Sequence, residues 1–84
     1  MFKIMIVEDE WIIAEDIRLT LIDMGYDVSS MINKGEFVID EIKKNKPNLI
    51  LMDINLGGEM DGIETASIVR VLFNIPIIYL IMGN

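Results

Sequence analysis

Hydrophobic residues along the chain form four short runs, and longer segments with a helical spacing separate them. The runs Lys3–Val7 and 49–52 are almost entirely apolar, which is typical of parallel strands buried on both faces. Residues 26–32 alternate enough to predict another strand. Pro76 leads into the fourth run, Ile77–Leu80, so the pattern predicts four strands.

The three intervening segments have apolar residues one helical turn apart, as expected for amphipathic helices. They cover residues 11–24, 35–44 and Gly62–Phe73. Gly25 follows the first, where a helix commonly ends on glycine, and Asp61 stands at the N-cap position of the third. The apolar positions that define the first two helices are Ile13, Ile17 and Leu21, and then Val38 and Ile42.

Strands and helices that alternate as β-α-β-α-β-α-β predict a parallel sheet with right-handed crossovers and helices on both faces. The 84 residues allow one domain. Only residues 81–84 follow the last predicted strand, and no helix does. We therefore expect an incomplete helical layer on one face and a bare strand edge.

Composition narrows the function. The chain has a net charge of −7, with no cysteine and no histidine. Disulfides, thiolate metal sites and histidine acid–base catalysis are therefore disfavoured. The acidic balance argues against direct nucleic-acid binding. The longest apolar run, residues 75–82, is too short to span a membrane, and the N-terminus lacks a secretory pattern.

Carboxylates follow two of the predicted strands. The first strand runs into Glu8 and Asp9, and the third runs into Asp53. Ligands of an open parallel sheet bind outside the carboxyl ends of its strands. Mg²⁺ prefers such oxygens, and the backbone carbonyl of Asn55 could complete the set. The alternative is that Glu8, Asp9 and Glu10 only favour a helix N-terminus, while Asp53 begins a polar loop.

Four segments together resemble the receiver domain of two-component response regulators. They are IMIVEDE at 4–10, PNLILMDI at 47–54, MDGIETA at 60–66 and NIPIIYL at 74–80. They occur in the order of the family and span nearly the whole chain. The resemblance implies a flavodoxin-like doubly wound parallel sheet with strand order 2-1-3-4, lacking the last strand and helices.

The resemblance also implies a function. Asp53 would accept a phosphoryl group from the phosphohistidine of a sensor histidine kinase, and the chain would be a cytoplasmic signalling domain, not an enzyme. Glu8 and Asp9 would hold Mg²⁺ together with Asp53, and Asn55 would give its backbone carbonyl. The adjacent glycines at 57–58 suit a loop that approaches the phosphoryl group, or an ordinary tight turn.

The chain departs from the family at two switch positions. Family members usually carry Thr or Ser just after the fourth strand, where this chain has Ile81. They also carry a Lys after a fifth strand, which would lie beyond Asn84. We therefore expect one receiver-like domain over residues 1–84, resembling the N-terminal two-thirds of a receiver. We expect slow phosphorylation of Asp53 and an impaired response to it.

Surface properties predict self-association. The third predicted helix is apolar on more than one face, and exposed apolar surface tends to recruit a partner. We expect a homodimer through this helix or through the edge of the fourth strand. Trp11, beside the acids, either contacts a kinase or packs at a helix N-terminus. Tyr79 is expected to be a strand residue covered by a helix.

Two other functions remain open. Phosphohydrolases of the haloacid-dehalogenase kind also place an aspartate nucleophile after a strand, but usually with a second acid two residues later, where this chain has Asn55. The other is an inert fragment whose only property is self-association. A dinucleotide site is disfavoured because no Gly-x-Gly-x-x-Gly follows the first strand.

Overall fold

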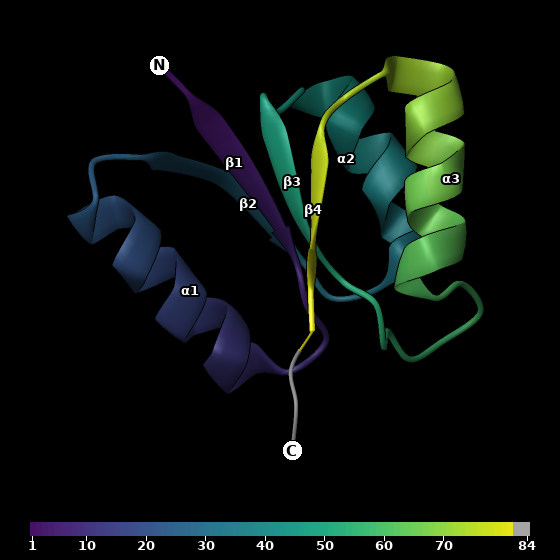
Figure 1. Ribbon diagram of the computed structural model, residues 1–84, viewed down its shortest axis with the longest axis horizontal. Helices are drawn as coiled ribbons and strands as arrows, with labels where there is room; N and C mark the ends of the chain where they lie inside the picture. The colour runs from purple at the N-terminus through teal and green to yellow at the C-terminus, as the bar shows by residue number, and fades with distance from the viewer. Residues whose placement is uncertain (82–84) are drawn as a thin grey trace.

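A computed structural model describes residues 1–81 of the chain (Figure 1). Strands and helices alternate as predicted. Their bounds are β1 Lys3–Val7, α1 Trp11–Asp23, β2 Asp27–Ile32, the 3-10 turn η1 Gly35–Phe37, α2 Val38–Lys44, β3 Leu49–Asp53, α3 Gly62–Phe73 and β4 Ile77–Leu80. Within residues 1–81, no helix has the length and apolar character needed to cross a bilayer.

The four strands form one parallel sheet in the order β2-β1-β3-β4, and the predicted order is therefore confirmed. Val7 of β1 lies opposite Met52 of β3, and Met52 lies opposite Tyr79 of β4. All carboxyl ends consequently point to the same end of the sheet, which is the lower end in Figure 1.

The main core lies between the sheet and the pair α2 and α3 (Figure 1). Alternate residues of β1 and β3 face these helices because side chains along a strand alternate between the two faces. Val38 and Ile42 of α2 are buried there, as the sequence predicted. The core cluster consists of Met5, Val7, Val38, Ile42, Ile50, Met52, Leu56, Val69 and Ile75.

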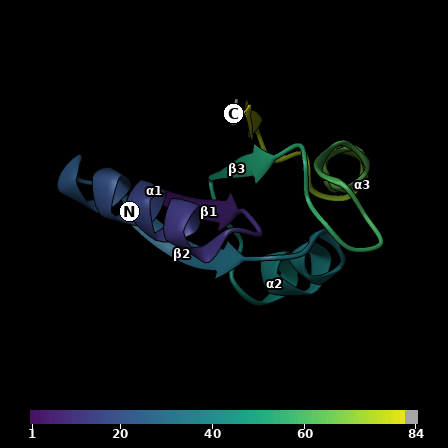
Figure 2. The same cartoon turned by 90° about the horizontal axis from the view of Figure 1, so that it is seen from below.

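The opposite face of the sheet carries only α1 among the described elements (Figures 1 and 2). Ala14 is the one fully buried residue of α1, and the predicted apolar positions of this helix are only half-buried. A hollow of about 500 Å³ lies beside the helix. Its lining is Phe2, Ile4, Leu21, Tyr26, Leu49, Leu51 and Ile78. The expected incomplete layer is therefore present over residues 1–81.

Some element boundaries differ from the prediction for identifiable reasons. The second helix begins as η1 before it becomes α2. At Gly35 an added Cβ would lie 2.2 Å from Thr65 Oγ1 and 2.8 Å from the Met60 carbonyl oxygen, so glycine permits this close approach to α3. Gly25, just after α1, has φ +94°, as expected of a glycine that ends a helix.

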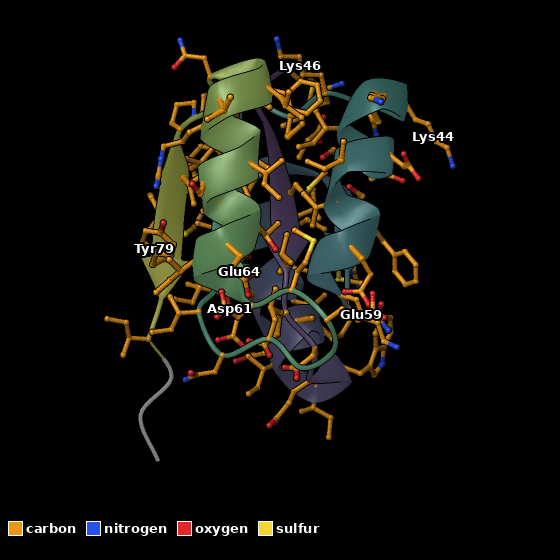
Figure 3. The ribbon with its side chains drawn as sticks, turned by 90° about the vertical axis from the view of Figure 1, so that its right-hand side faces the viewer. Lys44, Lys46, Glu59, Asp61, Glu64 and Tyr79 are labelled. Atoms are coloured by element: carbon orange, nitrogen blue, oxygen red, sulfur yellow. The ribbon has the colours of Figure 1, made fainter. Side chains whose placement is uncertain are left out.

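The N-terminus of α3 is held by a capping box. The Asp61 side chain accepts a hydrogen bond from the Glu64 amide at 2.8 Å, and the Glu64 side chain accepts one from the Asp61 amide at 3.4 Å. Both residues lie at the lower end of α3 in Figure 3. The two bonds satisfy amides that a helix N-terminus otherwise leaves unpaired. The helix therefore begins at a defined residue, directly after the loop that follows β3.

We expect Asp61→Ala to lower the free energy of unfolding by about 1 kcal/mol, because the Glu64 amide loses its acceptor. Urea denaturation measures this change. The matched control is Glu10→Ala at the N-cap position of α1, where no side-chain cap hydrogen bond is present. Equal losses in the two variants would contradict a specific role for the capping box.

Candidate functional site: an acidic cluster at the strand ends

The carboxyl ends of β1 and β3 lie side by side and bring three acids together. Glu8 and Asp9 follow β1, and Asp53 is the last residue of β3. One carboxylate oxygen from each of the three lies within 4.8 Å of those of the other two. The parallel pairing of Val7 with Met52 causes this grouping, because it aligns the residues that follow in each strand.

Two of the acids are buried. Glu8 is 3% exposed and Asp53 is 5% exposed, whereas Asp9 is open to solvent. The pKa of Glu8 is raised to about 7. Burial is the largest cause, the hydrogen bond from the Glu10 amide acts in the opposite direction, and the neighbouring Asp9 and Asp53 add to the rise. At neutral pH and without a cation, Glu8 is therefore partly protonated, which relieves the repulsion among the three groups.

The surroundings of the cluster supply no balancing positive side chain. Among residues 1–81, the one salt bridge joins Arg18 to Glu15, away from these acids. Figure 3 shows Lys44 and Lys46 at the end of the molecule opposite Asp61. Negative charge thus gathers where the strands end, and this favours a cation.

Backbone amides orient each of the three carboxylates. The Glu10 amide donates to Glu8 Oε2 at 3.0 Å, and the Asn55 amide donates to Asp53 Oδ1 at 2.9 Å. Asp9 Oδ2 accepts a hydrogen bond from the Gly57 amide at 3.3 Å, although the two residues are 48 positions apart in the sequence. The sequence did not indicate these donors, because every residue type except proline carries an amide.

Gly62 brings α3 close to the acidic cluster. A Cβ at this position would lie 2.0 Å from the Asp53 carbonyl oxygen, so no larger residue fits without a backbone shift. The sequence does show a glycine directly after the capping Asp61. That a glycine is required there follows only from the short distance between α3 and β3, which local sequence patterns do not reveal.

The cluster fits a hard divalent cation. Oε1 of Glu8 is buried and has no hydrogen-bond partner among the described residues. A buried acceptor of this kind is costly unless something satisfies it, and a cation would. The alternative explanation, that the acids only favour the N-terminus of α1, does not account for the grouping of Glu8 and Asp9 with Asp53 of β3, and Glu10 at the N-cap position makes no side-chain cap hydrogen bond.

The other residues singled out from the sequence surround the cluster. Asn55 is joined to Asp53 through its amide, and its backbone carbonyl as a metal ligand remains a prediction. Trp11 is 67% exposed and lines a hollow of about 270 Å³ together with Glu8. Ile81 follows β4 and is 78% exposed. Its neighbour Leu80 lies opposite Asp53 in the sheet.

Tyr79 packs against the core cluster as a half-buried strand residue. Its hydroxyl accepts a hydrogen bond from Arg70 of α3 at 3.1 Å. The expectation that a helix covers it therefore holds.

Parallel topology and an acidic cluster at the ends of β1 and β3 define a receiver-type signalling domain. The chain belongs to the response regulator receiver domain family, whose pattern matches residues 4–83. Members of this family bind Mg²⁺ at an acidic cluster and work with histidine kinases in two-component systems.

Individual relatives agree with this assignment. The chain is 39% identical over 80 residues, 95% of its length, to the sensory transduction protein BceR of Halalkalibacterium halodurans, and it spans 34% of that protein. The signal receiver domain of a modulated diguanylate cyclase from Desulfovibrio desulfuricans G20 superposes with a TM-score of 0.94 at 33% identity. That match covers all of this chain and 67% of the other.

A further solved relative is the N-terminal domain of a response regulator/sensory box/GGDEF 3-domain protein from Carboxydothermus hydrogenoformans. It is 37% identical with a TM-score of 0.85, covering 92% of this chain and 62% of the other. These structures confirm the receiver fold.

We expect the free energy of unfolding, measured in EDTA, to fall as pH rises from about 4.5 to 7. Glu8 binds its proton more tightly in the folded chain (pKa about 7) than in the unfolded chain (about 4.5). Its stabilising contribution is therefore fully present below pH 4.5 and lost above 7, a change of about 1–3 kcal/mol. Glu8→Gln removes this slope.

The matched control is Glu15→Gln. Hydrogen bonding to Arg18 lowers the pKa of Glu15, so this group acts below pH 4.5 and leaves the slope between 4.5 and 7 intact. Urea denaturation at a series of pH values distinguishes the variants. A slope that persists in Glu8→Gln would contradict the assignment.

Proposed function

We propose that Asp53 is the phospho-acceptor of a two-component phosphorelay. A carboxylate oxygen of Asp53 attacks the phosphorus of a kinase phosphohistidine, the N–P bond breaks, and an O–P bond forms an acyl phosphate. The observation that carries this proposal is the placement of a buried carboxylate at the end of β3 beside two further acids. The Asn55 amide fixes Oδ1, so we assign the attack to Oδ2.

We propose Glu8, Asp9 and Asp53 as the carboxylate ligands of Mg²⁺, with the backbone carbonyl of Asn55 beside them. When bound, Mg²⁺ would neutralise the oxygens of the transferred phosphoryl group. Glu8 must lose its proton to bind the ion. Its buried Oε1, which has no hydrogen-bond partner among residues 1–81, would then be available as a ligand atom. The Glu10 and Asn55 amides keep their acids oriented in the absence of the ion.

We assign the phosphoryl donor to a sensor histidine kinase and the location of this chain to the cytoplasm, and we assign residues 1–84 to one receiver-like domain. The name of the BceR relative, a sensory transduction protein, supports a signalling role. A phosphohydrolase of the haloacid-dehalogenase kind is disfavoured because Asn55 stands where the second acid is needed. The domain would then hold one phosphoryl group and not turn over substrate.

The response to phosphorylation is proposed to be weak. Ile81 follows β4 next to Leu80, which pairs with Asp53, and an isoleucine side chain has no hydrogen-bond donor. A phosphoryl group on Asp53 would therefore lack the hydroxyl contact that the family uses here. We expect slow modification and a reduced structural response.

Incubation with acetyl phosphate and Mg²⁺ should add one phosphoryl group at Asp53, detected by intact-mass spectrometry and peptide mapping. Asp53→Asn should abolish the gain, and EDTA should slow it by at least tenfold because the phosphoryl charge is no longer neutralised. Asp40→Asn, an exposed acid on α2, is the matched control and should leave the rate unchanged.

Rapid and stable modification would contradict the impaired switch, and modification of Asp53→Asn would contradict the site. Steady turnover of a generic phosphoester that depends on Asp53 would favour the phosphohydrolase. If the wild-type chain neither gains a phosphoryl group nor binds Mg²⁺, the inert fragment becomes the better description.

We also propose a homodimer, because α3 and β4 leave apolar side chains in solvent. On the outer side of α3, Ile63 is 58%, Val71 82% and Leu72 57% exposed. On β4, Ile78 is 52% exposed, and no strand lies on the outer edge of β4 among residues 1–81. Covering this surface would stabilise the dimer by about 25 cal/mol for each Å² of apolar area removed from water.

Light scattering at tens of micromolar should give the mass of a dimer. Val71→Lys should lower dimer affinity if α3 forms the contact, and Ile78→Lys should do so if the edge of β4 forms it. Ile12→Lys on α1, where the native side chain is also 82% exposed, is the matched control and should have no effect. A monomeric wild-type chain would refute the dimer.

A further inference from the structure

The loop after β3 contacts two of the three acids through its backbone. Residues 55–57, which we call the clamp segment, present alternate amides to the cluster. The Asn55 amide donates to Asp53 at 2.9 Å and the Gly57 amide donates to Asp9 at 3.3 Å. The clamp segment therefore joins the ends of β1 and β3 across the cluster.

The residue between these amides fixes the segment to the core. Leu56 is 7% exposed and belongs to the core cluster. Gly58, which follows, has φ +91°, and a Cβ there would lie 3.3 Å from the Glu36 carboxylate oxygens. The amide of Gly57 thus has a buried anchor on one side and a glycine-dependent turn on the other, so its direction is set by the fold.

Asp9 is the member of the cluster with the least support from packing. It is exposed, whereas Glu8 and Asp53 are buried. An exposed side chain loses conformational entropy when it binds a ligand, and a hydrogen bond that orders it beforehand reduces that loss. The Gly57 amide makes this hydrogen bond with Oδ2, and Oδ1 is left for a ligand.

We propose that the Gly57 amide is a positioning group that holds Asp9 ready for a divalent cation. The proposal rests on the Mg²⁺ site proposed above. It goes further, because it assigns part of the affinity to a loop residue whose side chain cannot bind metal. The space around Gly57 agrees with this role. A Cβ there would contact only Asp9 Oδ2, at 3.5 Å, and φ lies outside the left-handed region.

The test compares Gly57→Pro with Gly57→Ala by calorimetric titration with Mg²⁺. Proline removes the N–H, and alanine keeps it while adding a Cβ at ordinary contact distance. We expect Gly57→Pro to bind Mg²⁺ roughly 3- to 10-fold more weakly, the size of one lost hydrogen bond. Gly57→Ala should bind like the wild type, and the thermal midpoint in EDTA should show that both variants fold.

A second measurement needs no cation and no proline. Amide hydrogen exchange of Gly57 in the wild-type chain should be slowed relative to Asp9→Ala, which lacks the acceptor. The Asn55 amide, bonded to Asp53, is the internal control and should be equally protected in both proteins. Equal exchange at Gly57 in the two proteins would overturn the proposal.

The outcomes separate this proposal from the site itself. If the wild-type chain binds no Mg²⁺, the proposed metal site fails. If the wild type binds Mg²⁺ and Gly57→Pro binds it equally well, the site stands and the positioning role of Gly57 is refuted. Weaker binding by Gly57→Ala as well as Gly57→Pro would also refute it, because alanine retains the donor.

Discussion

Repulsion among three carboxylates at one end of the sheet is the constraint around which this domain is organised. The register of β1 against β3 forces Glu8, Asp9 and Asp53 together. Without a cation, the fold reduces the conflict in two ways: burial favours a proton on Glu8, and backbone amides donate to each acid. Both measures leave the oxygens grouped, so the arrangement that places three acids side by side is also the one that offers a divalent ion the oxygen ligands it prefers.

Much of the fold was predictable because local patterns and tertiary structure agree. Buried strands have apolar runs, and the capping Asp61 marks the first turn of α3 in both sequence and structure. The face of α1 was predicted less well. Its apolar spacing predicted a buried face of Ile13, Ile17 and Leu21, yet these residues are only half-buried, because a single helix does not cover that side of the sheet.

The acidic cluster was predictable as a set of residues but not as a geometry. Parallel topology places Glu8 and Asp53 at one sheet end from the order of elements alone. Which amides orient them depends on the path of the loop after β3, and this path is fixed by the burial of Leu56 and the positive φ of Gly58. Such contacts are nonlocal, so residue type and spacing do not specify them.

The hollow beside α1 leaves this helix less completely packed against the sheet than α2 and α3 are. The other two helices share the main core with the sheet. Helix α1 packs against β1 and β2, and on that face of β1 the side chains of Ile4 and Ile6 are only 2% and 0% exposed, so detaching the helix would expose buried apolar surface. Opening α1 alone would therefore require these side chains to enter water. Helix α1 begins at Trp11, directly after the acids, and so its opening would change access to the site while Asp53 stays in place.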